Sequence, residues 1–412
     1  MVFLYNIFIY LYTGIIRISS IWNKKAELWV KGRKDWYEDL SGKINKEDKI
    51  IWMHCSSAGE LEQGKPIIEK LKAGYPDHKI LITVFSPSGY GPAFKFQQAD
   101  IVSYLPVDTR TNADAFIKLV NPRMGIFIKY EFWYHHLASA AFHHIPLLLV
   151  SAVFRKEQVF FKKYGGFYRQ MLFFFRHILV QDNSSLELLR GIGIDHCSLS
   201  GDTRFDRVIE IANDFKDIPV IREFAGNNKI IVAGSTWYED EKALANLELS
   251  NNSKLVIAPH DINEKRIHQI EELFADSCRY SKWNSESVNK KVLIIDNFGM
   301  LSKLYHYATV AYVGGGFTRD GIHNILEAAV YNKPVVFGPN YSKYREAKEM
   351  IFVKGAFSFK NNEELKAIMN RLLNDNIINK EAAISAGDYV NNNTGATNKI
   401  MEYIQANRLL TS

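Results

Sequence analysis

Residues 49–73 read KIIWMHCSSAGELEQGKPIIEKLKA, and this stretch predicts a buried strand that leads directly into a helix. The apolar run Ile50–His54 fits the strand, and the residues after Glu60 fit the helix. Between them, Ser57 and Gly59 are small enough to leave the backbone open to a ligand, and the free N–H groups of a helix start attract anions. Glu60 can accept a proton from a substrate. Alternatively, the serines only cap the helix and Glu60 only favours its dipole.

Short apolar runs alternate with helical patterns along the chain, which predicts parallel strands covered by helices on both faces. The first series of candidate strands is Ile50–His54, Lys79–Thr83, Ile101–Tyr104, Met124–Ile128, Leu147–Val150 and His177–Val180. The second series is Ile230–Ala233, Lys254–Ala258, Val292–Ile295, Val310–Val313 and Pro334–Phe337. We therefore predict an α/β fold of two tandem doubly wound domains that face a cleft, because ligands bind at the carboxyl ends of such strands.

The length of 412 residues also favours two domains over one ordinary core. We expect a membrane anchor segment at residues 1–22, a first domain at 23–206, a second domain at 207–380 and a helix at 381–412 that crosses back to the first domain. The three scattered cysteines indicate a reducing compartment without a disulfide framework. A net charge of +6 suits an anionic substrate or a membrane surface and does not require nucleic acid.

The N-terminal segment is apolar and is followed by a basic flank. Residues 1–16 carry no charged side chain, and the flank contains Arg17, Lys24, Lys25, Lys31, Arg33 and Lys34. As a helix this run would be about 24 Å long, shorter than the hydrocarbon core of about 30 Å. No basic residues precede it, which argues against a cleavable signal peptide, and the flank predicts a cytoplasmic protein body. We predict an anchor, interfacial or barely spanning, rather than a buried core helix.

In the second half, three loops that follow candidate strands carry polar or glycine-rich motifs. The turn Gly234–Thr236 offers hydroxyls and backbone N–H groups suited to a phosphate, although a helix cap explains it equally well. The glycines at 314–316 indicate a sharp turn or contact with a ligand; alternatively, they form a flexible loop before a capped helix. The third loop contains His260, whose ring can hydrogen-bond to a base or a phosphate. Alternatively, His260 has no role in binding.

A helix is expected to start at His323 and Asn324, with Glu327 about one turn later, placed to bind ribose hydroxyls. The sequence has no His-Glu-x-x-His and no Gly-x-x-x-x-Gly-Lys-Ser/Thr motif, and no Asp-x-Asp follows a candidate strand. Zinc hydrolysis and P-loop phosphoryl transfer are therefore not expected.

With these motifs in order, the chain resembles the 3-deoxy-D-manno-octulosonic acid (Kdo) transferases of lipid A and lipopolysaccharide assembly. The motifs are Trp-x-His-x-x-Ser-x-Gly-Glu at 52–60, Thr-x-x-Ser-Pro-x-Gly at 83–89, Tyr-Leu-Pro-Val-Asp at 104–108, Tyr-Glu-Phe-Trp at 130–133, Gly-Asp-Thr-Arg-Phe-Asp at 201–206, Gly-Ser-Thr at 234–236 and Gly-x-His-Asn-x-x-Glu at 321–327. Together with the apolar segment they span nearly the whole chain, and this order is hard to obtain by chance.

The resemblance implies a GT-B fold and an inverting glycosyltransferase that moves Kdo from CMP-Kdo to a lipid A precursor (lipid IVA), without a metal or cofactor. Glu60 would be the base, and Glu131 would orient the acceptor or support Glu60, with a structural cap as the alternative. Candidates for donor binding are Ser235, Thr236, His260, Gly315, Gly316, Asn324, Glu327 and Arg204. Candidates for acceptor binding are Ser57, Gly59, Arg155 and Lys162.

The implied partners are CMP-Kdo, the lipid A precursor and the phospholipid surface of the inner membrane, at its cytoplasmic face, with no nucleic acid. The aromatic and basic segment 154–176 would suit an amphipathic lipid, or it is a partly buried helix with solvated charges. Two departures from the family concern binding residues. Pro259-His260-Asp261 stands where the family usually has Arg-His after the proline, so a nucleotide-binding arginine is either lost or replaced by Arg266. Ser151-Ala152-Val153 stands where the family typically has Asn-Ala-Arg.

Two other functions fit parts of this pattern. Another GT-B enzyme, such as a nucleotide-sugar 2-epimerase or a different glycosyltransferase, would bind a nucleotide without needing the anchor. A membrane-surface binding module would keep the fold without turnover. Tight binding of UDP-sugars without binding of CMP would indicate the first alternative. Replacement of Glu60 by Gln or Ala would leave the second unaffected, whereas a transferase should lose most of its rate.

Overall fold

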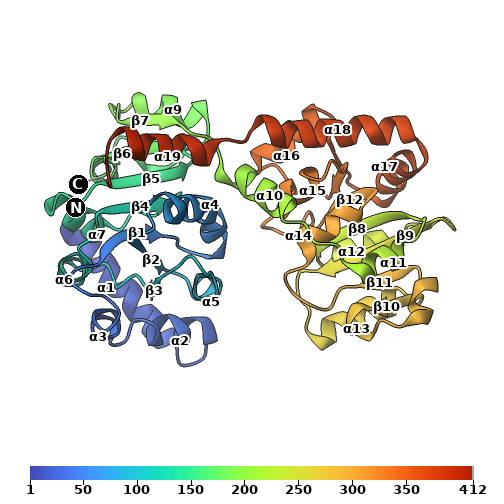
Figure 1. Ribbon diagram of the computed structural model, residues 1–412, viewed down its shortest axis with the longest axis horizontal. Coiled ribbons are helices and arrows are strands. Elements are labelled where there is room, and N and C mark those ends of the chain that lie inside the picture. The colour runs from blue at the N-terminus through green and yellow to red at the C-terminus, as the bar shows by residue number, and fades with distance from the viewer. Residues whose placement is uncertain (411–412) are drawn as a thin grey trace. The chain divides into compact units, whose positions relative to one another are not determined.

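The computed structural model describes residues 1–410, which form two compact units (Figure 1). Unit 1 contains Met1–Arg207 together with the chain from Thr394 onward, and unit 2 contains Val208–Asn393. Each unit holds a seven-stranded sheet in which all neighbouring strands run parallel. The predicted α/β class with two doubly wound domains is confirmed.

The sheet of unit 1 has the order β3-β2-β1-β4-β5-β6-β7. Its strands are β1 (Lys49–His54), β2 (His78–Val84), β3 (Ile101–Tyr104), β4 (Met124–Ile128), β5 (Leu147–Ala152), β6 (His177–Val180) and β7 (Cys197–Leu199). Every β1 residue after Lys49 is buried, as expected for a parallel sheet covered on both faces. Adjacent side chains enter different core clusters, Trp52 on one face of the sheet and Met53 on the other.

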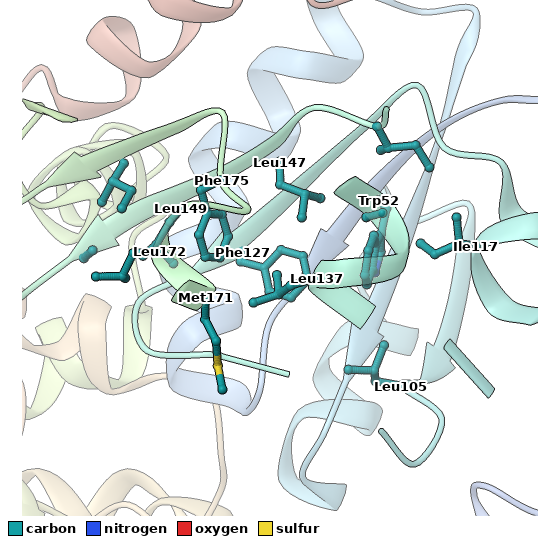
Figure 2. Close-up of a cluster of buried hydrophobic side chains, with 14 of the residues drawn as sticks. Trp52, Leu105, Ile117, Phe127, Leu137, Leu147, Leu149, Met171, Leu172 and Phe175 are labelled. Atoms are coloured by element: carbon teal, nitrogen blue, oxygen red, sulfur yellow. The ribbon is translucent and has the colours of Figure 1, made fainter. Parts of the chain in front are cut away.

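The core on the Trp52 face also holds a side chain in place near the carboxyl ends of the strands. Figure 2 shows Trp52 beside Phe127 of β4, and their rings meet edge to face with centroids 4.8 Å apart. The Trp52 indole N–H donates to Thr83 Oγ1 (2.8 Å). A buried indole needs such a partner, because leaving its N–H unpaired would cost about 1–3 kcal/mol. The core thereby holds the hydroxyl of Thr83 in place near the carboxyl end of β2.

Helices cover both faces of this sheet. They are α1 (Val2–Ser19), α2 (Lys24–Lys31), α3 (Trp36–Ser41), α4 (Ala58–Gly74), α5 (Pro87–Phe94), α6 (Arg110–Val120), α7 (Tyr134–Phe142), η1 (Val159–Phe161), α8 (Gly166–Leu172), α9 (Asn183–Arg190), α10 (Thr203–Asn213), which continues into unit 2, and the returning α19 (Ala396–Ala406). Helix α19 packs on α4 and adds Ile400, Met401 and Ile404 to the core cluster that contains Met53.

Unit 2 repeats the design with the strand order β10-β11-β9-β8-β12-β13-β14. Its strands are β8 (Lys229–Thr236), β9 (Ser253–Pro259), β10 (Ser277–Arg279), β11 (Val292–Ile294), β12 (Val310–Val313), β13 (Val335–Phe337) and β14 (Ala356–Ser358). Its helices are α11 (Pro219–Ala225), α12 (Tyr238–Ala245), α13 (Glu264–Leu273), η2 (Tyr280–Lys282), η3 (Ser285–Asn289), α14 (Leu301–Leu304), η4 (Tyr305–Tyr307), α15 (Leu326–Ala329), α16 (Arg345–Phe352), α17 (Asn362–Asn374) and α18 (Asn376–Asn392).

The chain returns to unit 1 later than the expected residue 381. Helix α18 packs on α15, α16 and α17 and therefore belongs to unit 2, and the return begins at Thr394. Asp206 fixes the returning chain, because its carboxylate accepts hydrogen bonds from the backbone N–H groups of Gly395 and Thr397 (both 2.7 Å).

Helix α1 lies against unit 1 by one face. The Tyr5 hydroxyl donates to Asp108 Oδ2 (2.5 Å), Asn6 Oδ1 lies 2.6 Å from His135 Nε2, and Ile9 is buried. The other face exposes Phe3, Leu4, Ile7, Phe8, Tyr10, Leu11, Ile15 and Ile18. By length and composition α1 is the one candidate membrane span among the described residues. It is thus not a buried core helix.

Candidate functional site

The segment between β1 and α4 is fixed by the loop that follows β2. The Cys55 N–H donates to the Thr83 carbonyl (3.0 Å), and the Ser56 carbonyl accepts the Ser86 N–H (2.7 Å). Gly89 approaches so closely that an added Cβ would lie 3.1 Å from the Ser57 carbonyl carbon. The two motifs at 52–60 and 83–89, distant in sequence, therefore form one surface at the carboxyl edge of the sheet.

Glu60 lies in the first turn of α4, with a fifth of its side chain exposed (20%). The Ser57 hydroxyl donates to Glu60 Oε2, so Ser57 does not cap α4 through its side chain. Glu60 Oε1 lies 3.9 Å from Lys129 Nζ. Gly59 is exposed beside it. This geometry gives an accessible carboxylate whose two oxygens each have a partner.

Glu131 belongs to the same edge, in the loop between β4 and α7. Its Oε2 accepts the Trp133 indole N–H (2.9 Å) and lies 3.5 Å from His54 Nε2. Burial raises the pKa of Glu131, but hydrogen bonds from His54, Ser56 and Trp133 outweigh burial and hold that pKa below its ordinary value. Glu131 is therefore ionised at neutral pH, and it does not cap α7, whose N-cap residue is Trp133.

Arg204 is held in unit 1 by a buried carboxylate. Its Nε and Nη2 lie 2.8 and 2.7 Å from Asp202 Oδ2, and Gln63 donates to Asp202 Oδ1 (3.2 Å). Burial alone would raise the pKa of Asp202, but the Arg204 guanidinium keeps it below its ordinary value. The pair fixes Arg204 with about a quarter of its side chain exposed (27%).

The acceptor candidates Arg155 and Lys162 lie in segment 154–176, apart from the Glu60 contacts. Arg155 lines a cavity of about 600 Å³, and Lys162 directly follows η1. Most phenylalanines of the segment are buried in the core of unit 1: Phe154, Phe160, Phe167 and Phe175. Exposed aromatic surface here comes mainly from Tyr164 and Phe173. The apolar character of the segment thus serves packing more than exposure.

In unit 2, the Gly-Ser-Thr motif closes β8. Ser235 has a left-handed backbone (φ 52°), and the buried Thr236 hydroxyl donates to Glu241 Oε1 (2.8 Å). Glu241 also pairs with Arg266. Arg266, the expected replacement for a nucleotide-binding arginine, is therefore already engaged by a buried carboxylate.

The three glycines after β12 are required by close backbone packing. A Cβ on Gly314 would lie 2.4 Å from the Ser235 carbonyl oxygen, and one on Gly316 would lie 2.5 Å from backbone after β13. Gly315 has φ 90° and donates its N–H to Asp240 Oδ2 (2.9 Å). The loops after β8, β12 and β13 meet through these glycines.

The expected helix start at His323 and Asn324 is wrong. Helix α15 begins at Leu326 and has four residues, because the His323 N–H bonds back to the Gly314 carbonyl (3.0 Å). Asn324 instead donates its side-chain amide to Glu327 Oε1 (3.1 Å). The pair Asn324 and Glu327 is preserved, and Asn324 Oδ1 also accepts the N–H of Leu326, the first residue of α15 (3.2 Å).

An aromatic stack joins two of these loops. The rings of Trp237 and His260 lie 4.5 Å apart, and those of His260 and His323 lie 4.8 Å apart. Burial lowers the pKa of His323 to about 4, so it is neutral and accepts the Trp237 indole N–H (3.3 Å). Sequence reasoning missed Trp237, which is 39% exposed. Its signal is an aromatic residue directly after the Gly-Ser-Thr turn.

Each unit therefore gathers candidate residues at the carboxyl edge of its own sheet. Unit 1 brings together Ser57, Gly59, Glu60, Glu131 and, near the passage to unit 2, Arg204. Unit 2 brings together Ser235, Thr236, His260, Gly315, Gly316, Asn324 and Glu327. Within residues 1–410 no three or more His, Cys, Asp or Glu side chains are grouped so as to hold a metal ion.

Some known proteins resemble this chain in sequence, and others resemble it in fold. A family model described as 3-deoxy-D-manno-octulosonic-acid transferase (kdotransferase) matches residues 30–207. The 3-deoxy-D-manno-octulosonic acid transferase of Rickettsia felis is 26% identical over 375 residues, 86% of this chain and 78% of that protein. The transferase of the same name from Aquifex aeolicus is 28% identical over 330 residues, 78% of this chain and 86% of that protein.

A solved structure with the same fold is the UDP-GlcNAc 2-epimerase from Neisseria meningitidis bound to UDP-GlcNAc. Its TM-score is 0.60 at 16% identity, over 87% of this chain and all of that chain (100%). This likeness concerns the fold alone, whereas the two transferases match in sequence over most of the chain. The chain is therefore similar in sequence to 3-deoxy-D-manno-octulosonic acid transferases over most of its length, and its fold is GT-B-like.

Proposed function

We propose that this protein transfers Kdo from CMP-Kdo to a lipid A precursor (lipid IVA), with inversion at the anomeric carbon, at the cytoplasmic face of the inner membrane. The proposal rests on the position and accessibility of Glu60. It is an accessible carboxylate within the family-matched region, at the edge of the sheet where ligands bind in such folds. A sugar hydroxyl is a poor nucleophile, and a carboxylate in hydrogen-bond reach can remove its proton.

In the proposed reaction Glu60 takes the proton of the acceptor hydroxyl while that oxygen bonds to the anomeric carbon of Kdo. The bond from this carbon to the CMP phosphate breaks, and its electron pair leaves on the phosphate. Glu131, ionised and held by His54 and Trp133, would orient the acceptor from the loop after β4. Ser57 and Gly59 would border the acceptor on the α4 side.

The donor would be held mainly by unit 2. Ser235 would offer its hydroxyl to the phosphate. Thr236, Gly315 and Gly316 would shape the turn around it, because the Thr236 hydroxyl and the Gly315 N–H are bound to Glu241 and Asp240. Asn324 and Glu327 would bind the ribose, and His260 with Trp237 would offer aromatic faces to the cytosine. Arg204 suits the donor carboxylate or phosphate, because a guanidinium binds such groups with two N–H donors.

The acceptor and the membrane would be reached through α1, Arg155 and Lys162. The contacts of Tyr5, Asn6 and Ile9 favour a helix that lies in the interface plane, since spanning would require α1 to leave unit 1. The exposed apolar face would enter the acyl region, while basic residues after α1 meet anionic headgroups.

The test is to mix purified protein, CMP-Kdo and lipid IVA and to measure the mass of the lipid product. A gain equal to one or more Kdo residues supports the proposal, and no gain with intact donor present refutes it. The epimerase-like fold makes a UDP-sugar enzyme the second candidate. Tight binding of UDP-sugars without binding of CMP would favour that candidate.

A further inference from the structure

Lys129 occupies a strained backbone position at the end of β4. Its φ is 65°, a left-handed value that residues other than glycine rarely adopt, and its N–H donates to the Val150 carbonyl (3.0 Å). Such strain persists only where the surrounding structure fixes it, and it is common at functional sites. In this conformation Lys129 Nζ lies 3.9 Å from Glu60 Oε1, with about a quarter of the lysine side chain exposed (24%).

The surroundings of Glu60 contain a second negative charge. Glu131, two residues after Lys129 on the same loop, is ionised. Burial together with the charges of Glu60 and Glu131 raises the pKa of the Cys55 thiol, which directly follows β1, so the thiol is neutral. The Ser57 hydroxyl at Oε2 is neutral as well. The charge of Lys129 also lowers the pKa of Asp202, although the main partner of Asp202 is Arg204.

A carboxylate near another carboxylate tends to take up a proton, unless a cation offsets the repulsion. Among the groups that contact Glu60, Lys129 supplies that cation. We propose that Lys129 is a positioning residue that orients Glu60 Oε1 for proton transfer. The inference rests on the proposed role of Glu60 as the base. With Ser57 at Oε2 and Lys129 at Oε1, the carboxylate has a fixed direction toward an incoming hydroxyl.

The test compares Lys129→Met, Lys129→Gln and Lys129→Arg with the wild type in Kdo transfer from CMP-Kdo to lipid IVA between pH 5 and 9. Removing the ammonium group leaves Glu60 Oε1 without this partner. We expect Lys129→Met and Lys129→Gln to lower kcat about tenfold or more at every pH, with the KM of both substrates unchanged. Lys129→Arg keeps the charge and should restore kcat. Two neutral variants are included so that a folding defect in one leaves the other to be measured.

The control is Lys79→Met, which removes a lysine paired with Asp48 (2.8 Å) near the start of β2. It should leave kcat and KM unchanged. A raised KM for the donor with an unchanged kcat would mean that Lys129 binds a substrate anion directly, and it would overturn the inference. An unchanged kcat and KM would also overturn it. Absence of transfer by the wild type at every pH would refute the proposed function itself.

Discussion

Glu60 and Glu131 lie at the same sheet edge but have different surroundings. Glu60 is bound by one hydroxyl and one ammonium group and keeps a fifth of its side chain exposed. Glu131 is held by His54 and Trp133, and its pKa is lowered by these contacts despite burial, which otherwise raises it. A base must reach its proton and accept it, so Glu60 suits proton transfer and Glu131 suits orientation.

At the residue scale, Trp237 provides a test of donor binding. Trp237→Ala should weaken CMP binding about tenfold, because stacking of a base on an aromatic ring contributes about 1–3 kcal/mol. Isothermal titration calorimetry measures the change. Phe352→Ala is the control, since Phe352 is a highly exposed aromatic residue on α16 of the same unit. Equal CMP affinity in wild type and Trp237→Ala would show that the base does not stack there.

The sequence predicts which residues reach the sheet edges but not which of them touch. Glu60 follows a buried strand, and strand ends of a parallel sheet share one edge, so its position follows from the pattern. Its contact with Lys129 depends on β1 pairing with β4, which chain order does not specify. The left-handed backbone of Lys129 leaves no sequence signal either, since lysine rarely adopts it.

At the element scale, the two faces of α1 have different surroundings. One face carries Tyr5 and Ile9 into unit 1, and the other remains apolar and exposed. Asp108 connects the docked face to the core, because it also accepts from His136 Nδ1 (2.6 Å). The helix is therefore part of the folded unit, and its exposed face is the surface that we propose for lipid.

Tyr5→Phe should lower the free energy of unfolding by about 1–2 kcal/mol, because a buried carboxylate loses a donor. Burial raises the pKa of Asp108, but hydrogen bonds from His136, Tyr5 and the His135 N–H hold it below its ordinary value. Such a group stabilises the fold above about pH 4 and loses this contribution as pH falls. The difference in unfolding free energy between Tyr5→Phe and wild type, measured by urea denaturation, should therefore become smaller below about pH 4.

Tyr10→Phe is the matched control for that measurement, since Tyr10 is exposed on the same helix. It should leave the unfolding free energy unchanged. A loss in Tyr10→Phe as large as in Tyr5→Phe would contradict the docking role of Tyr5.

Charges on the exposed face of α1 should abolish binding to lipid. The double variant Phe8→Glu with Leu11→Glu places carboxylates where acyl chains would lie, and we expect most protein to stop co-floating with anionic phospholipid vesicles. Ile377→Glu with Ile384→Glu introduces the same two charges at exposed apolar residues of unit 2 and should not change flotation. Undiminished flotation of the double variant would exclude α1 as the lipid surface.

The central strands follow from sequence, but three short strands at or near the sheet edges do not. The short strands β7, β10 and β14 each contain serine, so no apolar run stands out, whereas the equally short β11 and β13 are wholly apolar and are predicted. The helix expected at His323 fails for another reason. Backbone hydrogen bonds to the glycine turn replace the helical ones there, and this tertiary contact is invisible in a local pattern.

At the scale of the whole molecule, the two units differ in how many chain segments form them. Unit 2 is one continuous segment, whereas unit 1 needs the chain beyond Thr394 to complete its core. The sequence suggested a crossing helix but placed the return too early, because α18 and α19 both have helical patterns and only packing separates them.

Truncation after Asn393 should therefore destabilise unit 1 alone. Ile400 and Ile404 are fully buried (0% exposed), and loss of each such side chain costs about 2–5 kcal/mol. Hydrogen exchange should show faster exchange in β1, β4 and α4, with β8 and β12 unchanged. Equal protection of unit 1 with and without α19 would contradict this account.

The most direct measurement of the central claim is the rate of Kdo transfer by Glu60→Gln, with donor binding measured alongside. The variant keeps the shape of the side chain and loses the proton acceptor, so the rate should fall roughly a hundred- to ten-thousand-fold while CMP-Kdo affinity stays unchanged. Glu62→Gln, two residues further on the same helix, should transfer at nearly the wild-type rate. A Glu60→Gln enzyme that transfers Kdo as fast as the wild type would contradict the assignment of Glu60 as the base.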